Sequence, residues 1–285
     1  MKNILLPTDF SKNAWNAILY ALELFREEKC TFYLLNAYTP SFYRMDYILG
    51  GPTVSAIPDL GVDLSLKGLE DTLERIENHH FNPRHTLKIL SAFNTLPDEV
   101  NAVCQDKNID MVVMGTQGAT GAKELFLGTN TVHVIRKATV PVLAVPSGYG
   151  FKDIKKVLLP TDYWSKYKAS ELRPLLGLVK RLGADLHILH ALEENELTEA
   201  QTLNKRHLQK LLKDLPEVVF TDDTSEYMPI IVLDFIEKHH IGLLAMMNRK
   251  HSFLERLIMK QNVDVVGYHS PIPFLVLTDT SEISK

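Results

Sequence analysis

The chain has 285 residues, of which 45% are hydrophobic and 23% charged, and its formal net charge is −4. This length suits two domains that each bury a core, and no apolar run approaches the roughly 20 residues that span a bilayer. Lysine and arginine are dispersed, which disfavours a nucleic-acid interface. The N-terminus lacks signal-peptide features, and the two cysteines are too few for a disulfide framework. We therefore expect a soluble, cytoplasmic protein with neither a membrane nor a nucleic acid as partner.

Short aliphatic runs alternate with amphipathic segments of helical length along the first half of the chain. A helix with one apolar face is predicted after the N-cap candidate Ser11. The alternation is typical of parallel strands covered by helices, so the pattern predicts a doubly wound α/β sheet. The predicted strands cover residues 3–7, 31–37, 85–92, 110–115 and 140–146.

The chain repeats this unit once. Residues 4–9 (ILLPTD) recur as residues 157–162 (VLLPTD), at an offset of 153, and the second strand recurs at an offset of 154. The fourth and fifth strands recur at an offset of 132, so the first copy carries about 22 extra residues between its second and fourth strands. Residues 39–60 have this length and lack sustained periodicity, and we interpret them as a long loop that covers the ligand edge as a lid.

The two copies are separated by a turn-rich linker at residues 146–150. We expect one domain at residues 1–148 and a second at residues 152–280.

Asp9 follows the first predicted strand, at the edge where open parallel sheets bind ligands. Its carboxylate can accept hydrogen bonds from ribose hydroxyls or from an exocyclic amine. The alternative is that Asp9 only caps the following helix. Asp162 occupies the same place in the second copy, and both interpretations apply to it.

Three spaced glycines follow the fourth strand of the first copy. Gly115 and Gly118 lack a Cβ, so backbone amides there can approach a phosphate chain closely. Residues 128–131 (GTNT) then open a helix whose N-terminus favours an anion. The spacing fits neither a Walker motif nor the dinucleotide-binding fingerprint. An isolated pair of glycines would indicate only a turn, but the third glycine and the hydroxyls favour a phosphate site.

These motifs resemble the universal stress protein family, whose nucleotide-binding members carry G-x2-G-x9-G-[ST] after the fourth strand. Gly115, Gly118, Gly128 and Thr129 fit this pattern. The resemblance covers nearly the whole chain as a tandem member, in both copies apart from the glycines. It implies two Rossmann-like, adenine nucleotide alpha hydrolase-like domains, each with a five-stranded parallel sheet of strand order 3-2-1-4-5. It also implies that the edge strands of the two copies pair within one chain.

The resemblance further implies that the first copy binds ATP, with Mg²⁺. The implied contacts to adenine, ribose and phosphates are Pro7, Thr8, Asp9, Ala37, Met114, Gly115, Gly118, Gly128, Thr129, Asn130 and Thr131.

The second copy departs from the glycine pattern. Met247, Lys250, Lys260 and Gln261 replace the three glycines and the threonine. Their side chains fill the space of a phosphate chain, which predicts one ATP per chain. Lys250 and Lys260 either attract another anion or form a solvated surface.

We expect an ATP-binding stress or signalling module rather than an enzyme. Slow ATP hydrolysis stays open, although Glu124 is the only acidic residue between Gly115 and Thr131. A structural module with a vestigial nucleotide site, a homodimer and an unidentified protein partner also stay open. No catalytic residue and no metal ligand is assigned, because His79–His80 and His239–His240 are interpreted as surface pairs and His133 as a packed helix residue.

Overall fold

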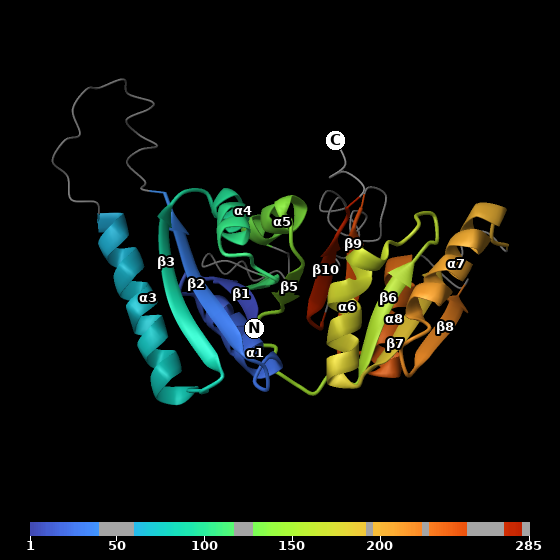
Figure 1. Ribbon diagram of the computed structural model, residues 1–285, viewed down its shortest axis with the longest axis horizontal. Helices are drawn as coiled ribbons and strands as arrows, with labels where there is room; N and C mark the ends of the chain where they lie inside the picture. The colour runs from blue at the N-terminus through green and yellow to red at the C-terminus, as the bar shows by residue number, and fades with distance from the viewer. Residues whose placement is uncertain (40–59, 117–127, 192–195, 224–227, 250–270, 281–285) are drawn as a thin grey trace, which may run out of the picture. The chain divides into compact units, whose positions relative to one another are not determined.

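The computed structural model describes residues 1–39, 60–116, 128–191, 196–223, 228–249 and 271–280 (Figure 1). The chain divides into two compact units. One unit comprises residues 1–121 and 127–140, and the other comprises residues 122–126 and 141–285. The predicted lid at residues 39–60 lies outside the described residues except for its two ends.

The first unit contains a parallel sheet with the strand order β3-β2-β1-β4. Its strands confirm the predicted positions to within one residue at each end. The core lies along β1 and β2, where Ile4, Leu6 and Phe32 are completely buried. The elements are β1 (Lys2–Pro7), α1 (Lys12–Leu24), β2 (Cys30–Tyr38), α3 (Leu60–His79), β3 (His85–Phe93), α4 (Leu96–Asp106), β4 (Met111–Gly115) and α5 (Thr129–Lys137).

Helix α1 begins where the sequence predicts. Ser11 is its N-cap, and the Ser11 hydroxyl accepts a hydrogen bond from the backbone N–H of Ala14 at 3.1 Å. Ala14, Ile18 and Ala21 form its buried face. The cap satisfies a backbone donor that the helix cannot pair, which fixes the start of α1 three residues after Asp9.

The second unit contains the parallel strand order β8-β7-β6-β9-β10, which is the implied order 3-2-1-4-5. The predicted fifth strand of the first copy, β5 (Val142–Val145), groups with this unit and pairs antiparallel with β10. The edge strands of the two copies therefore pair within the chain, as the resemblance implied. The other elements are β6 (Lys156–Thr161), α6 (Ala169–Leu182), β7 (Asp185–Ala191), α7 (Glu199–Leu212), β8 (Val218–Asp223), α8 (Met228–His239), β9 (Leu243–Asn248) and β10 (Phe274–Thr278).

The strand registers confirm the internal repeat. Ile4 lies opposite Phe32 on β2 and opposite Met111 on β4. Its counterpart Val157 lies opposite Leu186 and Leu243, which are the residues that the sequence offsets assign. The two copies thus share the pairing of their three central strands.

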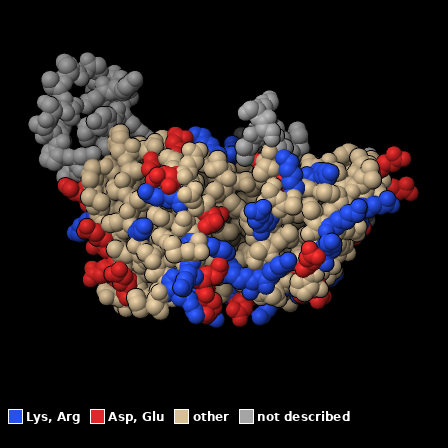
Figure 2. Space-filling model, viewed as in Figure 1, with Lys and Arg blue, Asp and Glu red and all other residues tan. Residues whose placement is uncertain are grey.

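Figure 2 shows acidic and basic side chains on the viewed face of each unit. Within the described residues, no helix has the length and apolar character needed to cross a membrane.

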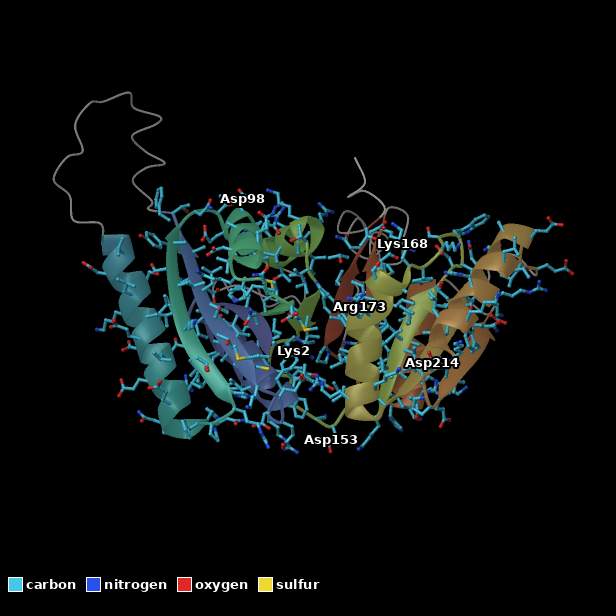
Figure 3. All side chains as sticks on the ribbon, viewed as in Figure 1. Lys2, Asp98, Asp153, Lys168, Arg173 and Asp214 are labelled. Atoms are coloured by element: carbon cyan, nitrogen blue, oxygen red, sulfur yellow. The ribbon has the colours of Figure 1, made fainter. Side chains whose placement is uncertain are left out.

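A buried ion pair ties α6 to the end of β9 in the second unit. The Glu171 side chain is fully buried and pairs with Arg249, whose side chain is 10% exposed. The same carboxylate accepts a hydrogen bond from the backbone N–H of Lys168, the N-cap of α6, at 2.9 Å. Lys168 is labelled in Figure 3 at the start of this helix. The carboxylate also accepts bonds from the backbone N–H of Thr280 at 3.1 Å and from its hydroxyl at 2.9 Å.

Arg249 has further partners at the same edge of the sheet. Its Nε lies 3.4 Å from Oδ2 of Asp279, just beyond β10. Its guanidinium carbon lies 5.1 Å from the ring centre of Tyr167, a cation–π contact. The side chains that follow β9 and β10 therefore bond to one another and to α6.

A buried histidine lies on β7 of the same unit. His187 is 7% exposed, and neither ring nitrogen has a hydrogen-bond partner among the described residues. Its ring contacts those of Phe235 and His239 on α8, at centroid distances of 5.8 and 6.1 Å. His239 also stacks on Phe235 at 4.0 Å and is half-buried, so this predicted surface histidine packs one side of its ring against α8.

Burial lowers the pKa of His187 below its ordinary value, because a charge there would lose its hydration. The positive charges of Lys156 and His239 lower this pKa further, whereas Asp185 and Glu217 act in the opposite direction.

Replacing Glu171 by Gln should lower the free energy of unfolding of the second unit by about 3 kcal/mol, because Arg249 would keep a buried charge with Asp279 as its one ion-pair partner among the described residues. Denaturant unfolding followed by circular dichroism measures the change. The control is Glu27→Gln, which breaks the exposed Glu27–Arg84 pair and should cost less than about 1 kcal/mol. Equal losses for the two variants would contradict the buried-pair interpretation.

The second unit should lose stability as the pH falls below about 6.5, the ordinary pKa of histidine. The unfolded chain takes up a proton there that folded His187 resists, so unfolding becomes more favourable on acidification. Replacing His187 by Leu should make the loss between pH 7.5 and pH 5.5 smaller, as measured by denaturant unfolding at both pH values. A variant that loses as much stability as the parent protein would rule out His187 as a source of this pH dependence.

Candidate functional site

A pocket opens in the first unit at the carboxyl ends of β1, β2 and β4. The space between its walls is about 510 Å³, open solvent included. The first turns of α1, α4 and α5 complete its wall. The lining residues are Pro7, Thr8, Asp9, Ala14, Ala37, Leu96, Met114, Gly115, Asn130 and Thr131.

Most of the predicted site residues meet in this pocket. Gly128 and Thr129 do not line it, although they precede Asn130 as the N-cap and first residue of α5. Gly118 lies outside the described residues. The predicted residues that line the pocket are Pro7, Thr8, Asp9, Ala37, Met114, Gly115, Asn130 and Thr131.

Asp9 is exposed at the mouth of the pocket. Its Oδ1 accepts a hydrogen bond from the backbone N–H of Ser11 at 3.1 Å. Because Ser11 caps α1, the alternative role of Asp9 as the helix cap is not the observed one. Phe10 has a φ of 63°, in the left-handed region, and its N–H donates to the Thr8 hydroxyl at 3.0 Å. This tight turn holds the Asp9 carboxylate at the edge of the sheet.

Asn36 fixes the end of β1 from the neighbouring strand. Its buried side-chain amide donates to the carbonyl of Thr8 at 2.7 Å, next to the bond from the Thr8 N–H to the Leu35 carbonyl at 2.8 Å. Sequence reasoning missed Asn36, although a polar residue inside a buried strand is a signal that it bonds to a specific partner. It also missed Ala14 and Leu96, for which the sequence carries no distinct signal.

The start of α5 forms the opposite wall of the pocket. The Gly128 N–H donates to the Thr116 carbonyl at 2.6 Å, and the Thr131 hydroxyl donates to the Gly115 carbonyl at 3.0 Å. These bonds anchor the helix N-terminus to the end of β4, with Asn130 lining the pocket. Unpaired N–H groups and the helix dipole make such an end favourable for an anion.

The described lining of the pocket is mostly uncharged. Of the residues described as lining the pocket, Asp9 alone is ionisable. Among the described residues there is no group of three His, Cys, Asp or Glu side chains placed to hold a metal ion. His133, expected to pack inside, is exposed on α5, so that interpretation was wrong.

At the corresponding edge of the second unit, larger side chains follow β6 and β9 than in the first copy. Met247, at the place of Gly115, is buried at the end of β9. Arg249 follows two residues later and pairs with Glu171 on α6. The Glu171 carboxylate also accepts a hydrogen bond from the Thr280 hydroxyl, just beyond β10. Lys250, Lys260 and Gln261 lie outside the described residues.

Helix α7 also binds the loop that follows β6. Three of its polar side chains donate to backbone carbonyls of this loop, which ties the loop to the helix. The pairs are Gln201 with Asp162 at 2.9 Å, Asn204 with Tyr163 at 2.8 Å, and His207 with Tyr167 at 2.9 Å.

Comparison with known proteins relates both units to one family. The sequence model of the universal stress protein family matches residues 1–146 and again residues 153–278. A universal stress protein of Methanocaldococcus jannaschii is 27% identical over 154 residues, which cover 50% of this chain and 94% of that protein.

Two solved structures share the fold over nearly the full length. A universal stress protein from Archaeoglobus fulgidus DSM 4304 has a TM-score of 0.69 and 19% identity, with 98% of this chain and 97% of that chain covered. A functionally unknown protein from Pseudomonas aeruginosa PAO1 has a TM-score of 0.59 and 13% identity, with 98% and 92% covered. Since the two family matches together span most of the sequence, the chain belongs to the universal stress protein family, as a tandem member with two copies of the family's domain.

Proposed function

We propose that the first unit binds one molecule of ATP per chain and that the protein acts as a nucleotide-dependent stress or signalling module. The observation that carries the proposal is the convergence of Asp9, Ala37, Gly115 and Asn130 on one pocket of the first unit. These residues come from four separate segments, and the resemblance assigns all of them to a nucleotide site.

The two ends of the pocket suit different parts of a nucleotide. Asp9 offers a carboxylate for ribose hydroxyls, beside the small side chains of Pro7 and Ala37. The α5 N-terminus offers a positive dipole end and the amide of Asn130 for phosphates. Thr129, which precedes Asn130, and Gly118, three residues after Gly115, are further proposed phosphate contacts. Mg²⁺ would accompany ATP on its phosphate oxygens and water, as is usual for this ion.

Binding rather than hydrolysis is proposed because the described part of the lining holds a single ionisable side chain, that of Asp9. Hydrolysis needs a group that orients the attacking water, normally together with a metal-holding carboxylate near the phosphates. Asp9 lies on the ribose side in this arrangement and is placed for neither role. A phosphate-release assay with purified protein tests this point, and steady turnover that disappears on replacing Asp9 by Ala would favour an ATPase.

Occupancy of the first unit alone follows from the contrast between the two sheet edges. Met247 brings a side chain to the position that is glycine in the first copy, and the Arg249 charge is already paired with Glu171. A phosphate chain that took Arg249 as its partner would have to break a buried, hydrogen-bonded ion pair, which is costly.

A reducing compartment such as the cytoplasm is part of the proposal. Cys30 and Cys104 are both buried and form no disulfide, and burial raises the pKa of the Cys104 thiol to about 12. Both cysteines therefore serve as packed apolar side chains, without a disulfide.

Calorimetric titration with Mg-ATP should give one site per chain. ATP at a hundredfold excess over Kd should stabilise the first unit by about 2.7 kcal/mol, which a thermal shift assay detects. Asp9→Ala should weaken binding about tenfold or more, because it removes a charged hydrogen-bond acceptor. Asp162→Ala, the matched control in the second copy, should leave binding unchanged. Two equivalent sites, or binding that depends on Asp162 rather than Asp9, would refute the assignment.

A further inference from the structure

Gly115 at the end of β4 faces the side chain of Asn13 on α1. Asn13 is the second residue of the helix and is 6% exposed. A Cβ added to Gly115 would lie 2.3 Å from the Asn13 side-chain nitrogen Nδ2, 2.7 Å from its Cγ and 3.1 Å from its backbone oxygen. Contacts of a Cβ atom with residues other than its own and its chain neighbours essentially never fall below 3.0 Å in proteins. No side chain fits at position 115 while Asn13 keeps this place.

This contact gives Gly115 a role that the sequence did not indicate. The spacing of the glycines predicted that Gly115 leaves room for a phosphate chain. Its missing Cβ also leaves room for the Asn13 side chain of α1. The glycine and the buried asparagine therefore fit together where the first turn of α1 meets the end of β4.

Gly115 passes this constraint on to the phosphate side of the pocket. Its carbonyl accepts the hydroxyl of Thr131, which is 2% exposed and lies in the first turn of α5. The next carbonyl, that of Thr116, accepts the N–H of Gly128 at 2.6 Å. The N-terminus of α5 is thus fixed to the short segment whose depth the Asn13 contact sets.

The second copy solves the same packing problem differently. Met247 has a side chain where Gly115 has none. Helix α6 begins seven residues after Asp162, whereas α1 begins three residues after Asp9. A longer loop before the helix accompanies the larger side chain, as expected if a short loop and a glycine go together in the first copy.

We propose that Asn13 is a positioning residue for the polyphosphate part of the nucleotide, and that it acts through Gly115. It does not line the pocket, but its side chain packs the end of β4 at the depth that places the α5 N-terminus. The adenine and ribose side, at Pro7, Asp9 and Ala37, lies on β1 and β2 and should not depend on this contact. The inference rests on the proposed ATP binding and names a determinant of its phosphate half.

The test compares Asn13→Ala, Gly115→Ala and the double variant in the full chain. Kd values for Mg-ATP and for adenosine are measured by calorimetry, adenosine by competition, and melting temperatures are measured without nucleotide. The matched control is Asn16→Ala. Asn16 lies three residues farther along α1, and its side chain is half-buried.

Asn13→Ala should weaken ATP binding about fivefold or more and leave adenosine binding within about twofold. Gly115→Ala should weaken ATP binding at least tenfold, about 1.4 kcal/mol, and lower the melting temperature. The double variant should recover part of both losses, because the Asn13→Ala change removes Nδ2 and Cγ while the backbone oxygen at 3.1 Å remains. Asn16→Ala should resemble the parent protein.

Equal weakening of ATP and adenosine binding by Asn13→Ala would overturn the positioning role and leave only a packing role. Additive effects in the double variant would overturn the contact itself. If Gly115→Ala does not fold, the ATP-to-adenosine ratio of Asn13→Ala decides the matter. A parent protein that binds neither ligand would refute the proposed function and the positioning role with it, whereas non-additive melting temperatures would still support the Asn13–Gly115 contact.

Discussion

The parallel pairing of β1 with β2 and β4 is the constraint on which the candidate site depends. Because the three strands run in the same direction, their carboxyl ends meet at one edge, and Asp9, Ala37 and Gly115 arrive there from distant parts of the sequence. The bond from Asn36 to the Thr8 carbonyl locks the first two ends together. The hydrogen bond from the Thr131 hydroxyl to the Gly115 carbonyl likewise ties the end of β4 to helix α5.

The two copies share the same strand registers but differ in the side chains at the carboxyl edge of the sheet. In the first copy the edge is left open between short side chains, and the exposed carboxylate of Asp9 takes part in a local turn. In the second copy the positive charge of Arg249 is paired with the negative charge of Glu171. Helix α7 binds the loop after β6. A buried pair of this kind contributes little net stability over apolar packing, but losing one partner is expensive. Its presence therefore restricts which substitutions the second edge tolerates.

Local signals explain which parts were predictable from the sequence. Strand positions, the Ser11 cap and the internal repeat follow from hydrophobic periodicity and short motifs, and the structure confirms each of them. The pairing of Glu171 with Arg249, and that of Asn13 with Gly115, joins residues far apart in the chain and depends on tertiary packing. A glycine pattern indicates that a Cβ would have no room, but it does not say which group takes that space. The predicted role of Gly115 therefore included a phosphate chain but not the Asn13 side chain.

The asymmetry between the copies bears on how a nucleotide could act. A ligand shifts an equilibrium only by its differential affinity for the states it connects. If ATP binds only at the first edge, its binding energy stabilises the segments that meet there, namely the ends of β1, β2 and β4 and the first turn of α5. The contacts of Arg249 with Glu171, Asp279 and Tyr167 join residues of the second copy to one another and involve no residue of the pocket. Duplication followed by divergence at one edge would thus leave one copy responsive to ATP and the other constant, so a partner that reads nucleotide occupancy must contact the first copy.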